Sequence, residues 1–110
     1  MTRVCLKKSE ITSYSSFSTE GHSGFGEEGS DIVCAALSAA TELVIEMLRR
    51  FGIESEVEID DKRALVLCNI TESEENAKKR DIIENLLGGY LDYIKEVEKE
   101  YPKYLKCKIS

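Results

Sequence analysis

Hydrophobic and polar positions alternate at the start of the chain. Within residues 2–8, Val4 and Leu6 fall on one face and mostly charged residues fall on the other, which is the period of a β-strand. Residues 11–20 are rich in Ser, Thr, Tyr and Phe, a composition that favours a second strand, antiparallel to the first. The first twenty residues therefore predict a pair of strands, after which a glycine-rich stretch begins.

Between residues 32 and 51 the hydrophobic period changes to that of a helix. Ser30 or Asp31 is a suitable N-cap, and Gly52 is a suitable stop. The predicted core face of this helix consists of Val33, Leu37, Ala40, Val44, Met47, Leu48 and Phe51.

Strand patterns return at residues 56–60 and 64–70, which predict a hairpin. Thr71 and Ser73 are candidate caps of a second helix, which ends before Pro102. Its predicted core face consists of Ala77, Ile83, Leu86, Leu87, Tyr90, Ile94 and Val97. The pair Gly88-Gly89 interrupts this helix, either as a kink or as a place of close packing.

Residues 105–109 alternate once more and predict a final strand. The resulting order is β-β-α-β-β-α-β, and the hairpins require antiparallel neighbours. We therefore expect an α+β fold with a mostly antiparallel sheet of about five strands and two helices on one face. At 110 residues, we expect residues 1–110 to form a single domain.

The amino-acid composition limits the kinds of partner that the protein is expected to bind. Apolar residues make up 42% of the chain and charged residues 33%, and the net charge is −6, so direct binding to nucleic acid is disfavoured and a basic peptide is favoured. No apolar run approaches the roughly 20 residues that a membrane span needs. Residues 1–8 lack the apolar segment of a secretory signal, and we expect a cytoplasmic protein with no membrane partner.

The four cysteines predict thiols rather than disulfides or metal ligands. There is no Cys-x-x-Cys pair, and the chain has one histidine, too few for a usual zinc site. No metal or other cofactor is therefore expected. Cys5, Cys68 and Cys107 each lie within a strand pattern, which predicts buried core residues.

The fourth cysteine, Cys34, follows His22 by twelve residues, across the glycine-rich stretch. A cysteine is a good nucleophile only as the thiolate, which a nearby imidazolium and a helix N-terminus both favour. We therefore expect His22 and Cys34 to form a nucleophilic pair. The alternative is a small buried cysteine beneath a loop, with His22 either facing solvent or holding the loop in place.

Asp31 has two possible roles: it orients His22, or it caps the helix. The glycine-rich stretch also spells G-x-G-x-x-G, which is typical of dinucleotide-binding loops, but Glu27 and Glu28 would repel a pyrophosphate. We interpret Gly24, Gly26 and Gly29 as hinges of a mobile substrate loop. Phe25 either contacts an apolar substrate side chain or anchors the loop.

A longer motif carries a family resemblance. Gly21-His22, a glycine-containing spacer and then Gly29-Ser30-Asp31-Ile32-Val33-Cys34-Ala35-Ala36 with Ser38 resemble the signature of the ribosomal-processing cysteine proteases, with Ser23 where that family usually has alanine. Tyr101-Pro102 before the last strand is also similar. The resemblance implies a homodimeric endopeptidase that removes an N-terminal extension from a large-subunit ribosomal protein. It implies that His22 and Cys34 are the catalytic residues.

Two other functions fit the residues. One is a non-catalytic dimeric interaction domain that binds a ribosomal protein or an assembling ribosome, with Cys34 inert. The other is a thiol redox sensor, which needs a second cysteine beside Cys34. The rate at which Cys34 is alkylated distinguishes the enzyme from the interaction domain.

Overall fold

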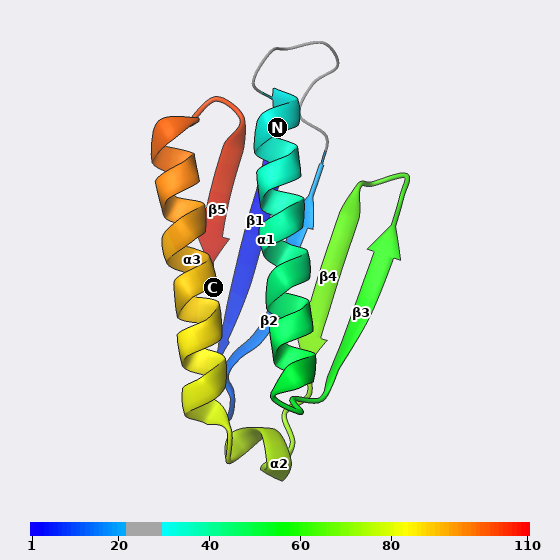
Figure 1. The fold of residues 1–110 in the computed structure, drawn as a ribbon, viewed down its shortest axis with the longest axis vertical. Helices are drawn as coiled ribbons and strands as arrows, with labels where there is room; N and C mark the ends of the chain where they lie inside the picture. The colour runs from blue at the N-terminus through cyan, green and yellow to red at the C-terminus, as the bar shows by residue number, and fades with distance from the viewer. Residues whose placement is uncertain (22–29) are drawn as a thin grey trace.

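The computed structural model describes residues 1–21 and 30–110, with the backbone alone for residues 30 and 31. Its elements are β1 (Thr2–Ser9), β2 (Ser13–Glu20), α1 (Ser30–Arg50), β3 (Ser55–Asp60), β4 (Leu65–Ile70), α2 (Glu74–Ala77), α3 (Arg80–Glu100) and β5 (Leu105–Ile109). The strands form one sheet in the order β3-β4-β2-β1-β5. The long helices α1 and α3 lie side by side over one face of this sheet (Figure 1).

The α+β class and the mostly antiparallel sheet of five strands are confirmed, but one pair of strands is parallel. The pairs β1–β2, β2–β4 and β3–β4 are antiparallel, whereas β1 and β5 are parallel. The reason is the path of α3, which returns the chain to the end of the sheet at which β4 began. The following strand, β5, therefore runs in the same direction as β4 and β1.

The predicted second helix is divided, which adds an element to the predicted order. Ser73 caps the short helix α2, because its side chain accepts a hydrogen bond from the Asn76 N–H at 3.1 Å. The chain then turns at Lys78 and Lys79 and starts again as α3. Gly88 lies within the continuous helix α3, and a Cβ added there would meet no atom within 4 Å, so close packing is not what this glycine provides.

The core lies between the helices and the sheet. Val33, Leu37 and Leu48 of α1 are buried as predicted, but Phe51 is 43% exposed at the C-terminal end of the helix. Thr41 and Ile45 are buried on the same helix, although the predicted face did not include them. The buried positions of α1 therefore recur every three or four residues and include the polar Thr41, which an apolar pattern does not identify.

The prediction that Cys5 is a buried core residue is wrong, because Cys5 lies on the face of the sheet that the helices do not cover. Val4 and Leu6 point to the helices and are fully buried, whereas Cys5, between them, is exposed. Because side chains alternate along a strand and the helices cover a single face, the position of Cys5 in β1 sends it to the other side. Cys68 is buried as predicted, and Cys107 is half-buried against the core.

Among the described residues, no helix is long and apolar enough to cross a membrane.

Candidate active site

Cys34 is the fifth residue of α1 and is half-buried. Its Sγ lies 3.4 Å from the Oγ1 atom of Thr2, a residue at the start of β1. The contact joins residues 32 positions apart in the chain. The sulfur therefore sits where the N-terminal part of α1 meets the beginning of β1, the strand between β2 and β5.

Gly21 lies at the same place, directly after β2. Its carbonyl oxygen accepts a hydrogen bond from Thr2 Oγ1 at 3.4 Å, and its N–H donates to the Arg63 carbonyl at 3.2 Å. Its φ is +100°, and a Cβ added there would lie 2.6 Å from the carbonyl oxygen of Met1. Both the backbone conformation and the close approach of Met1 require glycine at this position.

Thr2 thus links the two chain segments that lead to the predicted catalytic residues. The Gly21 carbonyl oxygen and the Cys34 sulfur each lie 3.4 Å from Thr2 Oγ1, so they are at most twice that distance apart. Gly21 is the residue immediately before His22. The chain therefore enters the glycine-rich stretch beside the sulfur, as a chain reversal between β2 and α1 requires.

His22 itself lies outside the described residues, and so do the predicted loop residues Gly24, Phe25, Gly26 and Gly29. Their pairing, hinge and substrate-contacting roles stay predictions.

The start of α1 differs in detail from the expected one. The helix begins at Ser30, so Asp31 is its second residue and Cys34 lies beyond the first four residues. The N–H groups that lack helical partners belong to the first turn of a helix, and Cys34 lies beyond that turn. Donors for an oxyanion at this helix end would therefore precede the nucleophile. The side chain of Asp31 is not among those described, and its orienting or capping role stays a prediction.

Cys68 and Cys107 lie in surroundings that favour the protonated thiol. Burial raises the pKa of the Cys68 thiol. Burial, followed by the negative charge of Glu98, raises the pKa of the Cys107 thiol. Both thiols therefore hold their protons more tightly than an ordinary cysteine, which makes them poor nucleophiles at neutral pH.

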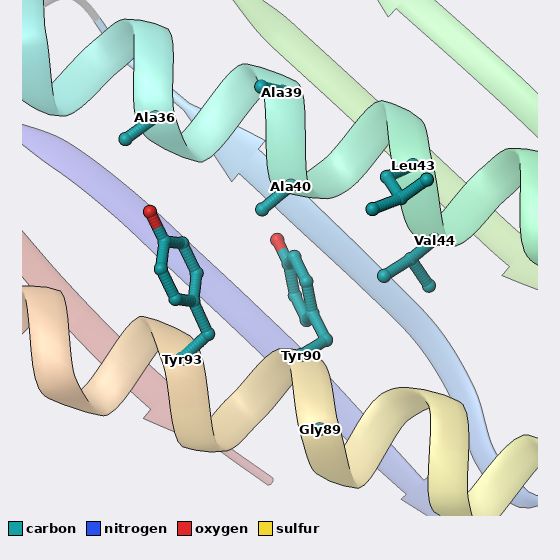
Figure 2. A pocket seen from close by; sticks show the side chains of 8 residues that line it. All are labelled: Ala36, Ala39, Ala40, Leu43, Val44, Gly89, Tyr90 and Tyr93. Atoms are coloured by element: carbon teal, nitrogen blue, oxygen red, sulfur yellow. The ribbon is translucent and has the colours of Figure 1, made fainter.

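An apolar groove lies between α1 and α3, with a volume of about 420 Å³. Ala36, Ala40 and Val44 of α1 and Tyr90 and Tyr93 of α3 project toward the space between the two helices (Figure 2). It is lined by Ala36, Ala39, Ala40, Leu43, Val44, Gly89, Tyr90 and Tyr93. At about 100° per residue, Ala36 and Leu43 lie about 160–180° around α1 from Cys34, so the groove opens on the helix face turned away from the sulfur.

Within the described part of the chain, no group of three or more His, Cys, Asp or Glu side chains is arranged to hold a metal ion.

Thr2 is the site residue that sequence reasoning missed. Its even position in β1 places it on the face of Val4 and Leu6, which predicts burial, and it is 3% exposed. Its contact with Cys34, however, depends on how α1 packs on the sheet. No local pattern indicates that contact.

The fold and the thiol together define a class: a small two-layer α+β protein with a cysteine near the start of the helix that covers its central strands. A profile of the cysteine protease Prp family matches residues 1–106. The chain belongs to this family and is a cysteine protease.

Solved structures share the fold. The ribosomal processing protease Prp from S. aureus, in complex with a substrate peptide, is 20% identical, with a TM-score of 0.81 and full coverage of both chains. The same protease with a covalently linked product peptide gives 20% identity over the whole of both chains and a TM-score of 0.78. SMU.848 from Streptococcus mutans gives 22% identity and a TM-score of 0.82 over 99% of this chain and 93% of its own. No curated protein matches the sequence.

Proposed function

We propose that this protein is a cysteine endopeptidase in which Cys34 is the nucleophile and His22 its acid–base partner. The observation that carries the proposal is the position of the Cys34 sulfur beside Gly21, the residue that precedes the only histidine in the chain. Membership of a cysteine protease family supports the same assignment. A related fold has been solved with a covalently linked product peptide, as a covalent mechanism requires.

The reaction has two stages. The Cys34 thiolate attacks the scissile carbonyl carbon, and the backbone N–H groups at the start of α1 stabilise the oxyanion. The His22 imidazolium gives its proton to the amine that leaves as the C–N bond breaks. Neutral His22 then takes a proton from water, whose oxygen attacks the thioester and returns the thiolate.

We propose that the substrate is the N-terminal extension of a large-subunit ribosomal protein, cleaved in the cytoplasm during ribosome assembly. The family resemblance of the Gly21–Ser38 motif supports this substrate, and a ribosomal processing protease with a substrate peptide shares the fold. The net charge of −6 also favours the basic peptides of ribosomal proteins.

Cleavage of defined peptides tests this function. Synthetic peptides spanning the N-termini of the organism's own ribosomal proteins are incubated with the protein, and the fragments are identified by mass spectrometry. We expect one peptide to be cut at a single bond. Cys34→Ala and His22→Ala should abolish cleavage while the folded far-UV spectrum is kept.

Cys5→Ala is the matched control for Cys34→Ala. Cys5 is an exposed thiol on the opposite face of the sheet, and its loss should leave cleavage unchanged. Cleavage by Cys34→Ala at the rate of the unmodified protein would exclude Cys34 as the nucleophile.

We also propose a homodimer, which the family resemblance implies, with the α1–α3 groove as its interface. Leu43 is 63% exposed and Tyr93 is 42% exposed at this groove, an apolar surface that a partner would cover. Leu43→Glu should shift the protein from dimer to monomer in sedimentation velocity. Ile59→Glu, at an equally exposed apolar position outside the groove, should not. A monomeric unmodified protein at 100 μM would rule the dimer out.

A further inference from the structure

Thr2 is held in one place by the strands around it. Its side chain is almost completely removed from solvent, and its N–H donates to the Tyr104 carbonyl at 2.9 Å. In the sheet it is the register partner of Leu105 on β5. The hydroxyl therefore has a defined position, and water does not compete strongly for it.

The two contacts of this hydroxyl are unequal. A hydroxyl group carries one proton to donate and two lone pairs that accept. The 3.4 Å from Thr2 Oγ1 to the Gly21 carbonyl oxygen is long for an O–H···O bond, which is usually about 2.7–2.8 Å. The same 3.4 Å to the Cys34 sulfur is an ordinary hydroxyl–sulfur distance, because sulfur is the larger atom. The Gly21 carbonyl is therefore a weak competitor for the proton.

The direction of the Thr2–Cys34 bond depends on the state of the sulfur. When Cys34 is a thiol, either atom can be the donor: its S–H can donate to Thr2 Oγ1 while the threonine proton is directed to Gly21. When Cys34 is a thiolate, it is only an acceptor, and the threonine proton turns to it. A hydrogen bond to an ionised acceptor is roughly twice as strong as one between neutral groups. Rotation of the Thr2 hydroxyl toward the sulfur therefore stabilises the thiolate form of Cys34 relative to the thiol.

We infer that Thr2 is a positioning residue for the nucleophile: its hydroxyl holds the Cys34 sulfur at the end of β1 and donates to it once it is ionised. This inference rests on the proposed function, because it assigns a role to Thr2 only if Cys34 is the reacting group. It adds a hydrogen-bond donor from β1 to the pair formed by His22 and Cys34.

The rate of Cys34 alkylation as a function of pH tests the inference. Iodoacetamide is added to folded protein in a Cys5→Ser background, which removes the exposed thiol, and the modification of each cysteine is followed by peptide mapping. Thr2→Val removes the hydroxyl and keeps the β-branched shape. Thr2→Ala serves the same comparison if valine is not accommodated.

We expect Thr2→Val to raise the midpoint of the alkylation profile by about one pH unit. Below that midpoint Cys34 should react roughly tenfold more slowly, which corresponds to about 1.4 kcal/mol. Well above it the rates should converge, because the thiolate is then formed in both proteins. Peptide cleavage should fall about tenfold near pH 7 and recover at higher pH, and Thr2→Ser should restore both profiles.

Thr12→Val is the matched control. Thr12 is also a buried threonine, and its hydroxyl donates to the Tyr14 carbonyl at 2.8 Å in the turn at the other end of β1. Its loss should reduce stability without moving the profile of Cys34.

The outcomes separate the inference from the function on which it rests. An unchanged profile in Thr2→Val, with a reactive Cys34 in the unmodified protein, would overturn the role of Thr2 alone. A uniform loss of rate at every pH would overturn the donation from Thr2 to the thiolate, because misplacement of the sulfur alone does not depend on ionisation. A Cys34 that reacts in the unmodified protein no faster than a cysteine in an unfolded peptide would overturn the proposed function.

Discussion

Replacement of Gly21 by alanine is the sharpest structural test at the active-site end of the sheet. The residue has a φ of +100°, and an added Cβ would lie 2.6 Å from the Met1 carbonyl oxygen. Real Cβ atoms essentially never approach another atom so closely. The methyl group therefore strains the backbone and also pushes the end of β1 away from the end of β2.

The two costs can be estimated separately. A non-glycine residue in this region of φ costs about 1–3 kcal/mol. The displacement of Met1 costs about another 1–2 kcal/mol, as overpacking does elsewhere. We therefore expect Gly21→Ala to lower the free energy of unfolding by about 2–5 kcal/mol. A domain of this size has roughly 5–15 kcal/mol in total, so the loss is a large fraction of the total and is measurable wherever the total exceeds it.

Urea denaturation followed by circular dichroism measures this loss. Gly88→Ala is the control, because a Cβ at Gly88 meets nothing within 4 Å and the residue lies inside α3. That substitution should stabilise the protein by about 0.5–1 kcal/mol, since alanine favours the helix. A Gly21→Ala protein within 0.5 kcal/mol of the unmodified one would refute the argument from φ and contact.

Two further predictions concern the rest of the fold. Burial raises the pKa of Tyr90 to about 12, so the unfolded chain loses this proton near pH 10 while the folded protein retains it. The free energy of unfolding should therefore fall by about 2–3 kcal/mol between pH 10 and pH 12. Urea titrations of Tyr90→Phe should show a smaller fall over the same range. An equal fall would show that Tyr90 is not its cause. Asn76 is buried and bonds Glu54 N, Glu54 O and Thr71 O through its side chain, so Asn76→Ala should cost roughly 3 kcal/mol by leaving these groups unsatisfied. A loss below 1 kcal/mol in the same titration would show that water replaces the amide.

Much of the fold follows from local patterns in the sequence. The alternation of Val4 and Leu6 predicts β1 and its buried face, and Ser73 is one of the two candidate caps, with Thr71, that the sequence offers for the next helix. These features depend on the spacing of apolar residues along the chain or on a hydrogen bond between residues close in sequence. Neither requires knowledge of the tertiary structure.

Other features depend on contacts between distant segments. The parallel pairing of β1 with β5 results from the return of the chain along α3. The exposure of Cys5 results from helices on one face of the sheet, and no strand pattern states which face is covered. The contact between Thr2 and Cys34 spans 32 residues, so a motif could indicate the cysteine but not its neighbour on β1.

The central claim is that His22 and Cys34 form an interacting pair, and the single histidine of the chain permits a direct measurement. The imidazole resonances are followed by NMR from pH 4 to pH 10 in the unmodified protein and in Cys34→Ser. A thiolate beside the ring stabilises the imidazolium, so we predict that His22 titrates above its ordinary value of about 6.5 in the unmodified protein. The midpoint should fall toward that value in Cys34→Ser. The same midpoint in both proteins would contradict the pairing.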